Sequence, residues 1–441
     1  MLKEKNKNSL RPHYPAAFPG IIKCLFWMGT EFIINIPRIL ELRKLYRTRK
    51  KNLENPTVVL VGDNLDEVNG IAITSRKFVR TMRKKNRDIY LIGVVFHNKT
   101  PRVEMEKGGI IMLPGRCSMV QPGYPHSETT IPRLDIMLKL LKKRPADLVE
   151  FETPNTVSHM VLFLSKMIGF KTIHHYRTDI PAYSDLLVKS SIGNWLIQTM
   201  VKTFTYMAGP VVVPSDYFKS KVEKLGVIPP HKITKLPRGV DLEHFNPEKA
   251  TNGAWEKYGN PTSGLRLIFV GRVSAEKNLP ALATILPDIF KQFPQTSLTV
   301  IGDGPYLETF KNLFSHEERL TFCGVLKGST LAGMYAAADL LVFPSLFDTF
   351  GNPVVEALAS GIPALVSNHG GPPEIVEDGR SGLIFNNEQP NDLQTKLLNL
   401  LGDRDLLNEL KSHSRERAMQ FTYEESTERF WEYFKQKVVE L

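Results

Sequence analysis

The sequence predicts an α/β protein with two doubly wound domains. Short apolar runs alternate with helical patterns along most of the 441 residues, which is typical of parallel sheets covered by helices on both faces. The alternation stops at a segment rich in proline and glycine, 236–249, and then starts afresh. The chain is also too long for one ordinary core, and its composition (42% apolar, 23% charged) is that of a globular protein.

The first block of alternation begins with a strand expected at 57–64 and a helix expected over Thr74 to Lys85. Further strands of this block are expected at 89–96, 109–113, 147–153, 171–176 and 210–215. In the second block, strands are expected at 266–272, 297–304, 320–326, 339–345, 362–367 and 382–385, and helices near 279–292, 306–314, 330–337 and 352–360. Ligands of open parallel sheets bind beyond the carboxyl ends of the strands. Both sets of strand-end loops should therefore face a cleft between the domains.

These patterns divide the chain into four parts. We expect a basic amphipathic N-terminal arm at 1–55, an N-terminal domain at 56–240 and a C-terminal domain at 241–420. The aromatic-rich end, 421–441, should be a helix that packs back on the domains.

The arm holds most of the net charge. Residues 1–55 contain twelve Lys or Arg and four Glu, giving +8 of the total of +11. The body is nearly neutral, which argues against nucleic acid as a partner. Inside the arm, residues 19–40 form an apolar patch with helical spacing, but its longest uncharged run, 24–30, is too short to span a bilayer. Two interpretations stay open: a helix lying on an anionic membrane surface, or a helix docked on the protein's own body.

The cysteines favour a reducing compartment. Cys24, Cys117 and Cys323 are odd in number, far apart and without metal-ligand spacing, so neither a disulfide framework nor a structural zinc is expected. No secretory signal is evident in the arm. We expect a cytoplasmic protein, with the inner face of the membrane as a second location.

The most informative stretch is PSLFDTFGNPVVEALASGIPALVS, 344–367. A loop carrying Asp348 leads through a glycine into a helix carrying Glu356, so both acids can face one ligand. The first amides of that helix would attract anions and hydroxyl oxygens; they belong to Phe350, Gly351 and Asn352. The alternative is an Asp in a turn and a Glu on an exposed helix face.

A second strand-end loop, GRVSAEKN at 271–278, carries Arg272 and Lys277. Two cations there can neutralise a diphosphate through charge-assisted hydrogen bonds, without a metal. The alternative is a solvated loop. Further glycine loops follow at 301–306 and 369–385.

Together these segments resemble the family-4 retaining glycosyltransferases, over about residues 57–440. The resemblance rests on VNG (68–70), YRTDIPAY (176–183), PRGVD (237–241), GRVSAEKN, IGDGP and FDTFGNPVVEALASGIP. It implies the GT-B fold, with two Rossmann-like domains facing a cleft. It also implies roles: Arg272 and Lys277 grip the donor diphosphate, Asp348 binds sugar hydroxyls beside the amides, and Glu356 holds the ribose. Gly70 would let the N-terminal domain approach the phosphates.

Two positions depart from the family's pattern. Asp348 stands where the first acid is usually Glu, which affects the choice of sugar. Arg177 stands where relatives commonly have His. An arginine stays protonated and cannot act as a general base, although it can stabilise the departing diphosphate or bind an anionic acceptor. His174 and His175 lie just upstream, either as histidines satisfied in the sheet or as catalytic groups.

The sequence therefore indicates a hexosyltransferase that moves a sugar from a UDP- or GDP-hexose to an acceptor hydroxyl, with retention. The basic arm favours a membrane glycolipid as acceptor, and a soluble acceptor or a catalytically impaired nucleotide-sugar binder are the alternatives. A nicotinamide oxidoreductase is disfavoured because no GxGxxG follows the first strand. No cofactor is expected, and no metal, since no Asp-x-Asp or His cluster lies near the site.

Overall fold

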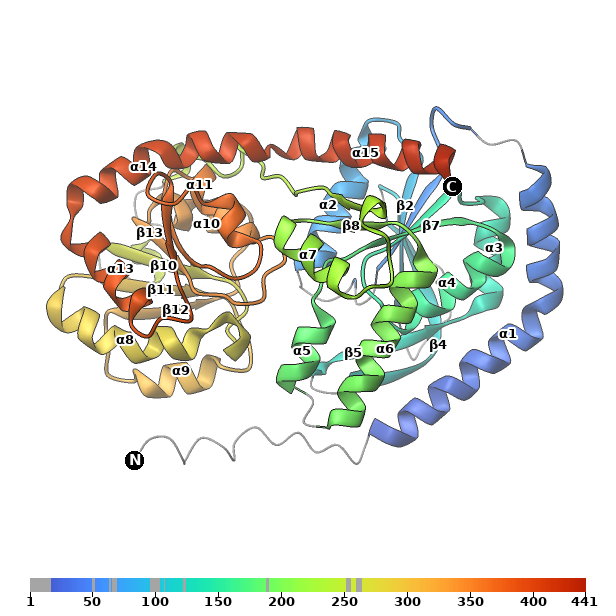
Figure 1. Cartoon of the computed structure of the whole chain (residues 1–441), viewed down its shortest axis with the longest axis horizontal. Helices are drawn as coiled ribbons and strands as arrows, with labels where there is room; N and C mark the ends of the chain where they lie inside the picture. Colours follow the sequence, from blue (N-terminus) through green and yellow to red (C-terminus); the bar gives the residue numbers. More distant parts are fainter. Residues whose placement is uncertain are drawn as a thin grey trace. The chain divides into compact units, whose positions relative to one another are not determined.

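A computed structural model of the chain describes residues 17–49, 52–62, 65, 70–95, 104–106, 108–121, 124–187, 190–250, 255–258 and 264–441. Its contacts divide the chain into two compact units. Unit 1 takes in 1–212, 223–234 and 431–441, and unit 2 takes in 213–222 and 235–430. Each unit holds one sheet with helices packed on it (Figure 1), which confirms the predicted fold class.

The sheet of unit 1 has the order β3-β4-β2-β1-β6-β7-β8-β9, with β5 paired to β4. Its strands are β1 Val58–Val61, β2 Ile89–Val95, β3 Glu104–Glu106, β4 Ile110–Gln121, β5 Tyr124–Pro132, β6 Leu148–Phe151, β7 Lys171–His175, β8 Val211–Val213 and β9 Ile233–Lys235. The central strands are parallel, but β3 and β5 run antiparallel to β4. The strand predicted at 109–113 is shorter than the observed β4. This strand continues past Pro114 and Gly115, because an irregularity in the register between Gly115 and Cys117 accommodates them.

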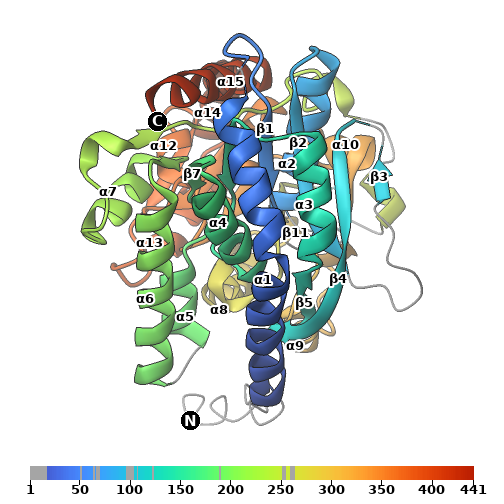
Figure 2. The same cartoon turned by 90° about the vertical axis from the view of Figure 1, so that its right-hand side faces the viewer.

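The helices of this part of the chain are α1 Ala17–Thr48, α2 Gly70–Lys84, α3 Leu134–Lys143, α4 Thr156–Ile168, α5 Ile180–Leu187, α6 Ser191–Ala208 and α7 Asp216–Lys224. Local signals explain the bounds of α4. The Asn155 side chain accepts a hydrogen bond from the backbone N–H of Ser158, and Gly169, with φ of +100°, ends the helix. Figure 2 shows α6, α4, α1 and α3 side by side on one face of the sheet.

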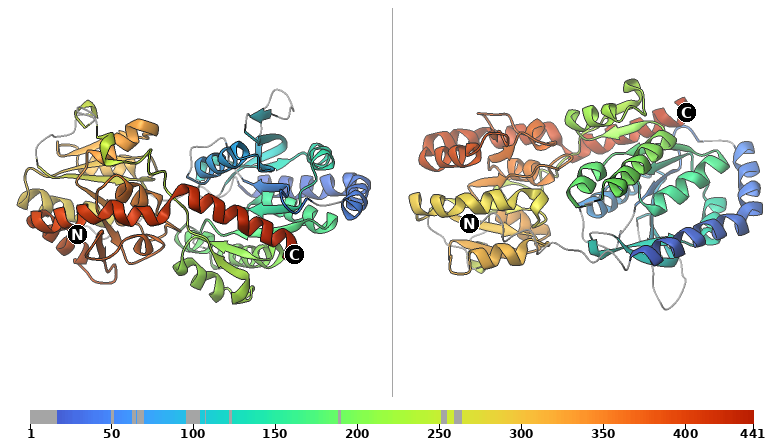
Figure 3. Two further views of the ribbon diagram at one scale, coloured as in Figure 1. Left: turned by 90° about the horizontal axis from the view of Figure 1, so that it is seen from above. Right: turned by 60° about the horizontal axis from the view of Figure 1, so that its bottom comes forward.

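Helix α1 is an integral part of unit 1. Ile39, Leu42 and Tyr46 are buried in the core that Val59 and Val61 of β1 also enter. The buried Glu31 carboxylate accepts hydrogen bonds from Arg116 Nε (2.7 Å) and from the Leu134 backbone N–H (2.9 Å). Both views in Figure 3 show α1 along the side of this unit. Of the two interpretations of the arm, docking on the protein's own body is therefore confirmed for this face of the helix. None of the described helices is long and apolar enough to cross a membrane.

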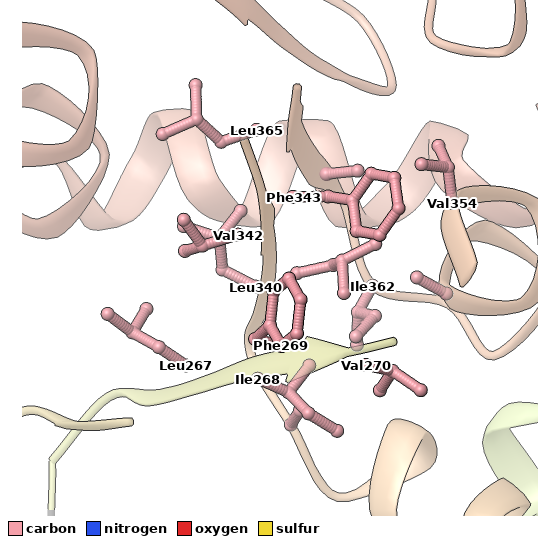
Figure 4. Packing of buried hydrophobic residues seen from close by; sticks show 14 of the residues in the cluster. Leu267, Ile268, Phe269, Val270, Leu340, Val342, Phe343, Val354, Ile362 and Leu365 are labelled. Atoms are coloured by element: carbon pink, nitrogen blue, oxygen red, sulfur yellow. The ribbon is translucent and has the colours of Figure 1, made fainter. Parts of the chain in front are cut away.

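Unit 2 contains a fully parallel sheet of order β12-β11-β10-β13-β14-β15. Its strands are β10 Arg266–Val270, β11 Ser297–Ile301, β12 Leu320–Gly324, β13 Leu340–Phe343, β14 Ala364–Ser367 and β15 Gly382–Phe385. Its helices are α8 Leu279–Gln292, α9 Leu307–Leu313, α10 Gly328–Ala336, α11 Asn352–Ala359, α12 Pro372–Ile375, α13 Asp392–Gly402 and α14 Arg404–Ala418. Figure 4 shows the core around β10 and β13, where the Phe269 and Phe343 rings stack with centroids 6.1 Å apart.

The last helix, α15 Tyr423–Glu440, begins in unit 2, and its residues from Trp431 onward belong to unit 1. There Trp431 is fully buried with the Arg87 guanidinium 5.3 Å from its ring, and Phe434 meets Phe78 edge-on. Short 3-10 turns lie at η2 Pro230–Lys232, η3 Pro247–Lys249, η4 Glu256–Tyr258, η5 Ala275–Lys277 and η6 Met419–Phe421.

Candidate active site

Four loops gather at the carboxyl edge of the unit 2 sheet, because β11, β10, β13 and β14 are neighbours in it. Two of these loops fit together through glycines. A Cβ added to Gly302 would lie 1.8 Å from the Gly271 carbonyl oxygen, and one added to Gly304 would lie 2.4 Å from that of Val273. Only glycine permits such backbone contact. The glycine loop after β11 thus supports the loop after β10 that carries the two predicted cations.

A second glycine pair supports the loop that carries Asp348. The Gly371 N–H donates to the Asp348 carbonyl oxygen at 2.8 Å. A Cβ on Gly370 would lie 2.5 Å from that same oxygen, and one on Gly371 would lie 2.4 Å from the Thr349 carbonyl oxygen. Any larger residue would push the two loops apart. The HGG segment after β14 therefore fixes the position of the Asp348 backbone.

The structure brings Lys277 and Asp348 together. Lys277 Nζ lies 2.6 Å from Asp348 Oδ2, and the two side chains are only 11% and 20% exposed. The ammonium also lies 5.8 Å from the centre of the Phe343 ring. Arg272 lies five positions before Lys277 in the same loop, with an exposed side chain. A cation and an acid from two predicted motifs thus meet at one edge of the sheet.

The start of α11 has the predicted geometry. Gly351 has a φ of +104°, which glycine adopts without strain, and it directly precedes Asn352, the first helical residue. Phe350 precedes Gly351, and its side chain is not available to a ligand. Its side chain is buried and its ring meets that of Phe421 at 6.1 Å, so its amide is the part that remains for a ligand.

Glu356 does not lie on an exposed helix face, as the alternative interpretation held. It is partly buried on α11, and its Oε2 accepts a hydrogen bond from the Tyr335 hydroxyl at 3.0 Å. Burial, followed by the charge of Glu356, raises the pKa of Tyr335 far above its usual value, so the phenol stays a donor. No sequence signal pointed to this role, because Tyr335 lies in a helix whose apolar pattern is typical of core residues.

In unit 1, Gly70 is the first residue of α2, and its neighbours 68 and 69 lie outside the described residues. Arg177 follows β7 and is buried. Its Nη1 lies 2.9 Å from Glu152 Oε1 and donates to Ser75 Oγ at 2.7 Å. The guanidinium is therefore held inside unit 1 by an acid and a hydroxyl from two other elements.

Two buried acids balance the charge of Arg177. Glu150, within β6, lies 3.9 Å from the guanidinium, and Glu152 follows the same strand. His175 Nδ1 lies 2.7 Å from Glu150 Oε1 and 3.1 Å from Arg177 Nε, so its tautomer decides which hydrogen bond it makes. Sequence reasoning missed both acids. The signal was present in DLVEFET, since acids inside an apolar strand are rarely buried without a partner.

His174 is a core residue. It is fully buried, its ring is edge-on to Phe204, and its Nδ1 lies 3.3 Å from Thr205 Oγ1. Burial, with a smaller effect of His159, lowers the pKa of His174 to about 3, so it is neutral at ordinary pH. Its interpretation as a histidine buried in the sheet is confirmed, although of the two ring nitrogens only Nδ1 has a hydrogen-bond partner among the described residues and the buried Nε2 has none.

Among the residues that the structure describes, no three His, Cys, Asp or Glu side chains gather as they do around a bound ion.

Family comparisons match both halves of the chain. The family described as Glycosyltransferase Family 4 matches residues 68–244, and the family described as Glycosyl transferases group 1 matches residues 255–417. The sulfoquinovosyl transferase SQD2 of Arabidopsis thaliana is 28% identical over 82% of this chain and 69% of its own length. An alpha-monoglucosyldiacylglycerol synthase of Streptococcus pneumoniae is 26% identical over 57% of this chain and 58% of its own. A GDP-mannose-dependent alpha-mannosyltransferase of Corynebacterium glutamicum is 27% identical over 57% and 58%.

Solved structures show the same fold. Sucrose-phosphate synthase of Thermosynechococcus elongatus superposes with a TM-score of 0.72 at 20% identity, over 87% of this chain and 99% of that one. HepE of Anabaena, in complex with UDP and glucose, gives 0.67 at 16% identity, over 86% and 99%. Two α/β units, one with a mixed sheet whose central strands are parallel and one with a fully parallel sheet, define together with these matches a glycosyltransferase of the GT-B fold, an enzyme that transfers hexosyl groups. Within that class, the chain belongs to glycosyltransferase family 4, and the predicted resemblance is confirmed.

Proposed function

We propose that the protein transfers a hexose from a nucleoside-diphosphate sugar to a hydroxyl group of a membrane glycolipid or its precursor, with retention at the anomeric carbon. The Lys277–Asp348 pair carries the proposal: Lys277 Nζ lies 2.6 Å from Asp348 Oδ2, and a cation suits a phosphate while a carboxylate suits sugar hydroxyls. The name of one relative, an alpha-monoglucosyldiacylglycerol synthase, supports a lipid acceptor. A GDP-mannose-dependent relative and a neighbour that binds UDP support the donor class.

In this proposal Lys277 and Arg272 hold the donor diphosphate, and their two positive charges balance it without a metal ion. Asp348 then turns to the hydroxyls of the sugar, beside the amides of Phe350, Gly351 and Asn352. Glu356, oriented by Tyr335, binds the ribose hydroxyls.

The reaction breaks the bond between the anomeric carbon and the β-phosphate oxygen. The acceptor oxygen bonds to the same face of the sugar, and its proton passes to the departing phosphate oxygen. Charge builds on that phosphate as the bond breaks, so Arg272 and Lys277 stabilise the transition state more than the ground state. Arg177 is not a base in this scheme. We assign it to balancing the charge of Glu152 and to holding Ser75 in place within unit 1.

We further propose that the enzyme works in the cytoplasm, at the inner face of a membrane. Exposed cations on the last turns of α1 support this location, since the cytoplasmic leaflet is anionic; they are Arg43, Lys44 and Arg47. A soluble acceptor and a donor binder without turnover remain the rival functions.

A donor and acceptor screen tests the proposal. The purified chain is offered labelled UDP- and GDP-hexoses, with diacylglycerol or phospholipid in detergent micelles, or with soluble sugars. We expect one donor to label the lipid, and Lys277→Met to abolish the labelling. If only the soluble sugars were labelled, the acceptor would be soluble and the proposed lipid acceptor would be wrong. Donor binding without any transfer would identify the impaired binder.

A further inference from the structure

Helix α6 exposes an apolar stripe along its whole length. Five large side chains recur on one side of the helix and are 40–73% exposed: Ile192, Trp195, Leu196, Met200 and Tyr206. The opposite side is apolar as well, with Val201, Phe204 and Ala208 buried. A surface helix needs only one apolar side to dock on its own protein. The second side, which we call the α6 stripe, therefore requires another explanation.

Apolar exposure continues across the neighbouring helices of unit 1. Phe163 of α4 is 50% exposed, and its ring meets Phe32 of α1 edge-on at 5.2 Å. On α1, Ile33 and Leu40 are 70% and 54% exposed, on the side opposite the core. Figure 2 shows α6, α4 and α1 in one layer. Exposed apolar side chains on three adjacent helices form a larger surface than scattered single residues would.

The charges on this layer have one dominant sign. Helix α6 contains no acidic residue, and its one charged residue, Lys202, is exposed. Exposed Arg43, Lys44 and Arg47 follow the apolar part of α1. The α6 stripe also contains a tryptophan and a tyrosine, whose rings favour the boundary between lipid and water. Apolar side chains with aromatic residues and flanking cations are the chemistry that binds an anionic bilayer surface.

We propose that the α6 stripe inserts into the surface of an anionic bilayer, with the outward side of α1 resting on the headgroups. The inference rests on the proposed function, in which the acceptor is a membrane lipid. In this arrangement unit 1 contacts the membrane through two helices, α6 and the docked helix α1. A symmetric contact between two copies fits less well, because two α6 helices would bring Lys202 near its own copy with no acid on either helix to balance it.

The test compares three forms of the full chain in vesicle sedimentation. The first is the wild type, and the second carries Ile192→Ser, Trp195→Ser and Leu196→Ser. The control carries Leu313→Ser and Val325→Ser, two apolar residues of unit 2 with comparable exposure, 61% and 53%. Vesicles contain phosphatidylcholine alone or with phosphatidylglycerol. Because the substituted side chains are exposed, all three forms should fold, which circular dichroism checks.

We expect the wild type and the control to sediment with the anionic vesicles, and the triple variant to bind them more than ~10-fold more weakly. Release of nucleoside diphosphate from the donor in vesicle-free solution should be equal in all three. Equal vesicle binding by the triple variant would overturn the proposal. So would light scattering that shows a wild-type dimer and a monomeric triple variant. If the proposed glycolipid transfer fails while the binding difference persists, only the proposed function falls.

Discussion

The Nζ of Lys277 lies 2.6 Å from Oδ2 of Asp348, so two groups that are proposed to bind different parts of the donor also form an ion pair with each other. Donor binding must therefore break or share this ion pair. The two charges act in opposite directions on a diphosphate, since the ammonium attracts it and the carboxylate repels it. For the sugar, the carboxylate is the binding group. The two residues should consequently respond differently to ligands with and without the sugar.

The first prediction separates these roles. Asp348→Asn should bind nucleoside diphosphate as tightly as the wild type or several-fold tighter, because a repelling charge is gone, while its kcat with the full donor falls by ~10–100-fold. Lys277→Met should weaken the binding of both nucleoside diphosphate and the full donor by ~10–100-fold. Calorimetry gives the affinities and a transfer assay the rates. Equal loss of diphosphate affinity in both variants would contradict the assigned roles.

Removal of the Tyr335 hydroxyl should act on donor binding rather than on chemistry. The hydroxyl donates to Glu356 Oε2 at 3.0 Å, and Glu356 is proposed to hold the ribose in ground state and transition state alike. Tyr335→Phe should therefore raise KM for the donor by ~3–10-fold and leave kcat nearly unchanged. Steady-state kinetics measures both, with Tyr306→Phe as the matched control on the same unit. A fall in kcat at constant KM would place Glu356 in the chemical step.

Arg177 and Glu152 should be coupled in stability. Arg177→Gln leaves two buried carboxylates without their main counter-ion and should destabilise unit 1 by about 3–5 kcal/mol. Adding Glu152→Gln should recover a large part of that loss in urea unfolding. The double variant also separates fold from function. If it is stable but inactive, the charge of Arg177 acts in the reaction, and if it is stable and active, Arg177 is a structural residue.

The sequence predicted the repeated α/β pattern well because buried parallel strands read as short apolar runs, and most predicted helices of unit 2 match to within two residues. The sequence also identified Lys277 and Asp348 as candidate site residues, but it did not predict the ion pair between them. The two residues are 71 positions apart, and their meeting depends on β10 and β13 being neighbours in the sheet.

Other features depend still more on tertiary structure. The partners of Arg177 come from α2, β6 and β7, and no spacing rule links such positions. The apolar pattern of the arm also did not show which side of α1 packs on unit 1. The buried Glu31 marks that side, but in the sequence this residue appeared only as a charge that interrupts the apolar patch.

Glu31 should be the main polar anchor of α1. Glu31→Ala removes the acceptor for Arg116 and for the Leu134 N–H, and should destabilise unit 1 by about 2–3 kcal/mol. Glu41→Ala on the same helix removes an exposed ion pair with Lys142 and should change stability little. Thermal or urea unfolding compares the two. Similar effects of both substitutions would mean that α1 is not anchored through Glu31.

His174 should make unit 1 less stable in mild acid. Its pKa is about 3 in the folded protein, against 6.5 when exposed, because burial disfavours the charged ring. The unfolded chain therefore binds the proton more tightly, and stability is lost as pH falls below about 6.5. Between pH 7 and pH 5 this one group should lower the free energy of unfolding by about 2 kcal/mol.

His174→Gln keeps a polar side chain beside Thr205 but cannot titrate, so urea unfolding at the two pH values should show a loss smaller by that amount. His231→Gln, which replaces an exposed histidine of the same unit, is the matched control. An identical pH dependence in His174→Gln would show that the ring of His174 reaches solvent in the folded state.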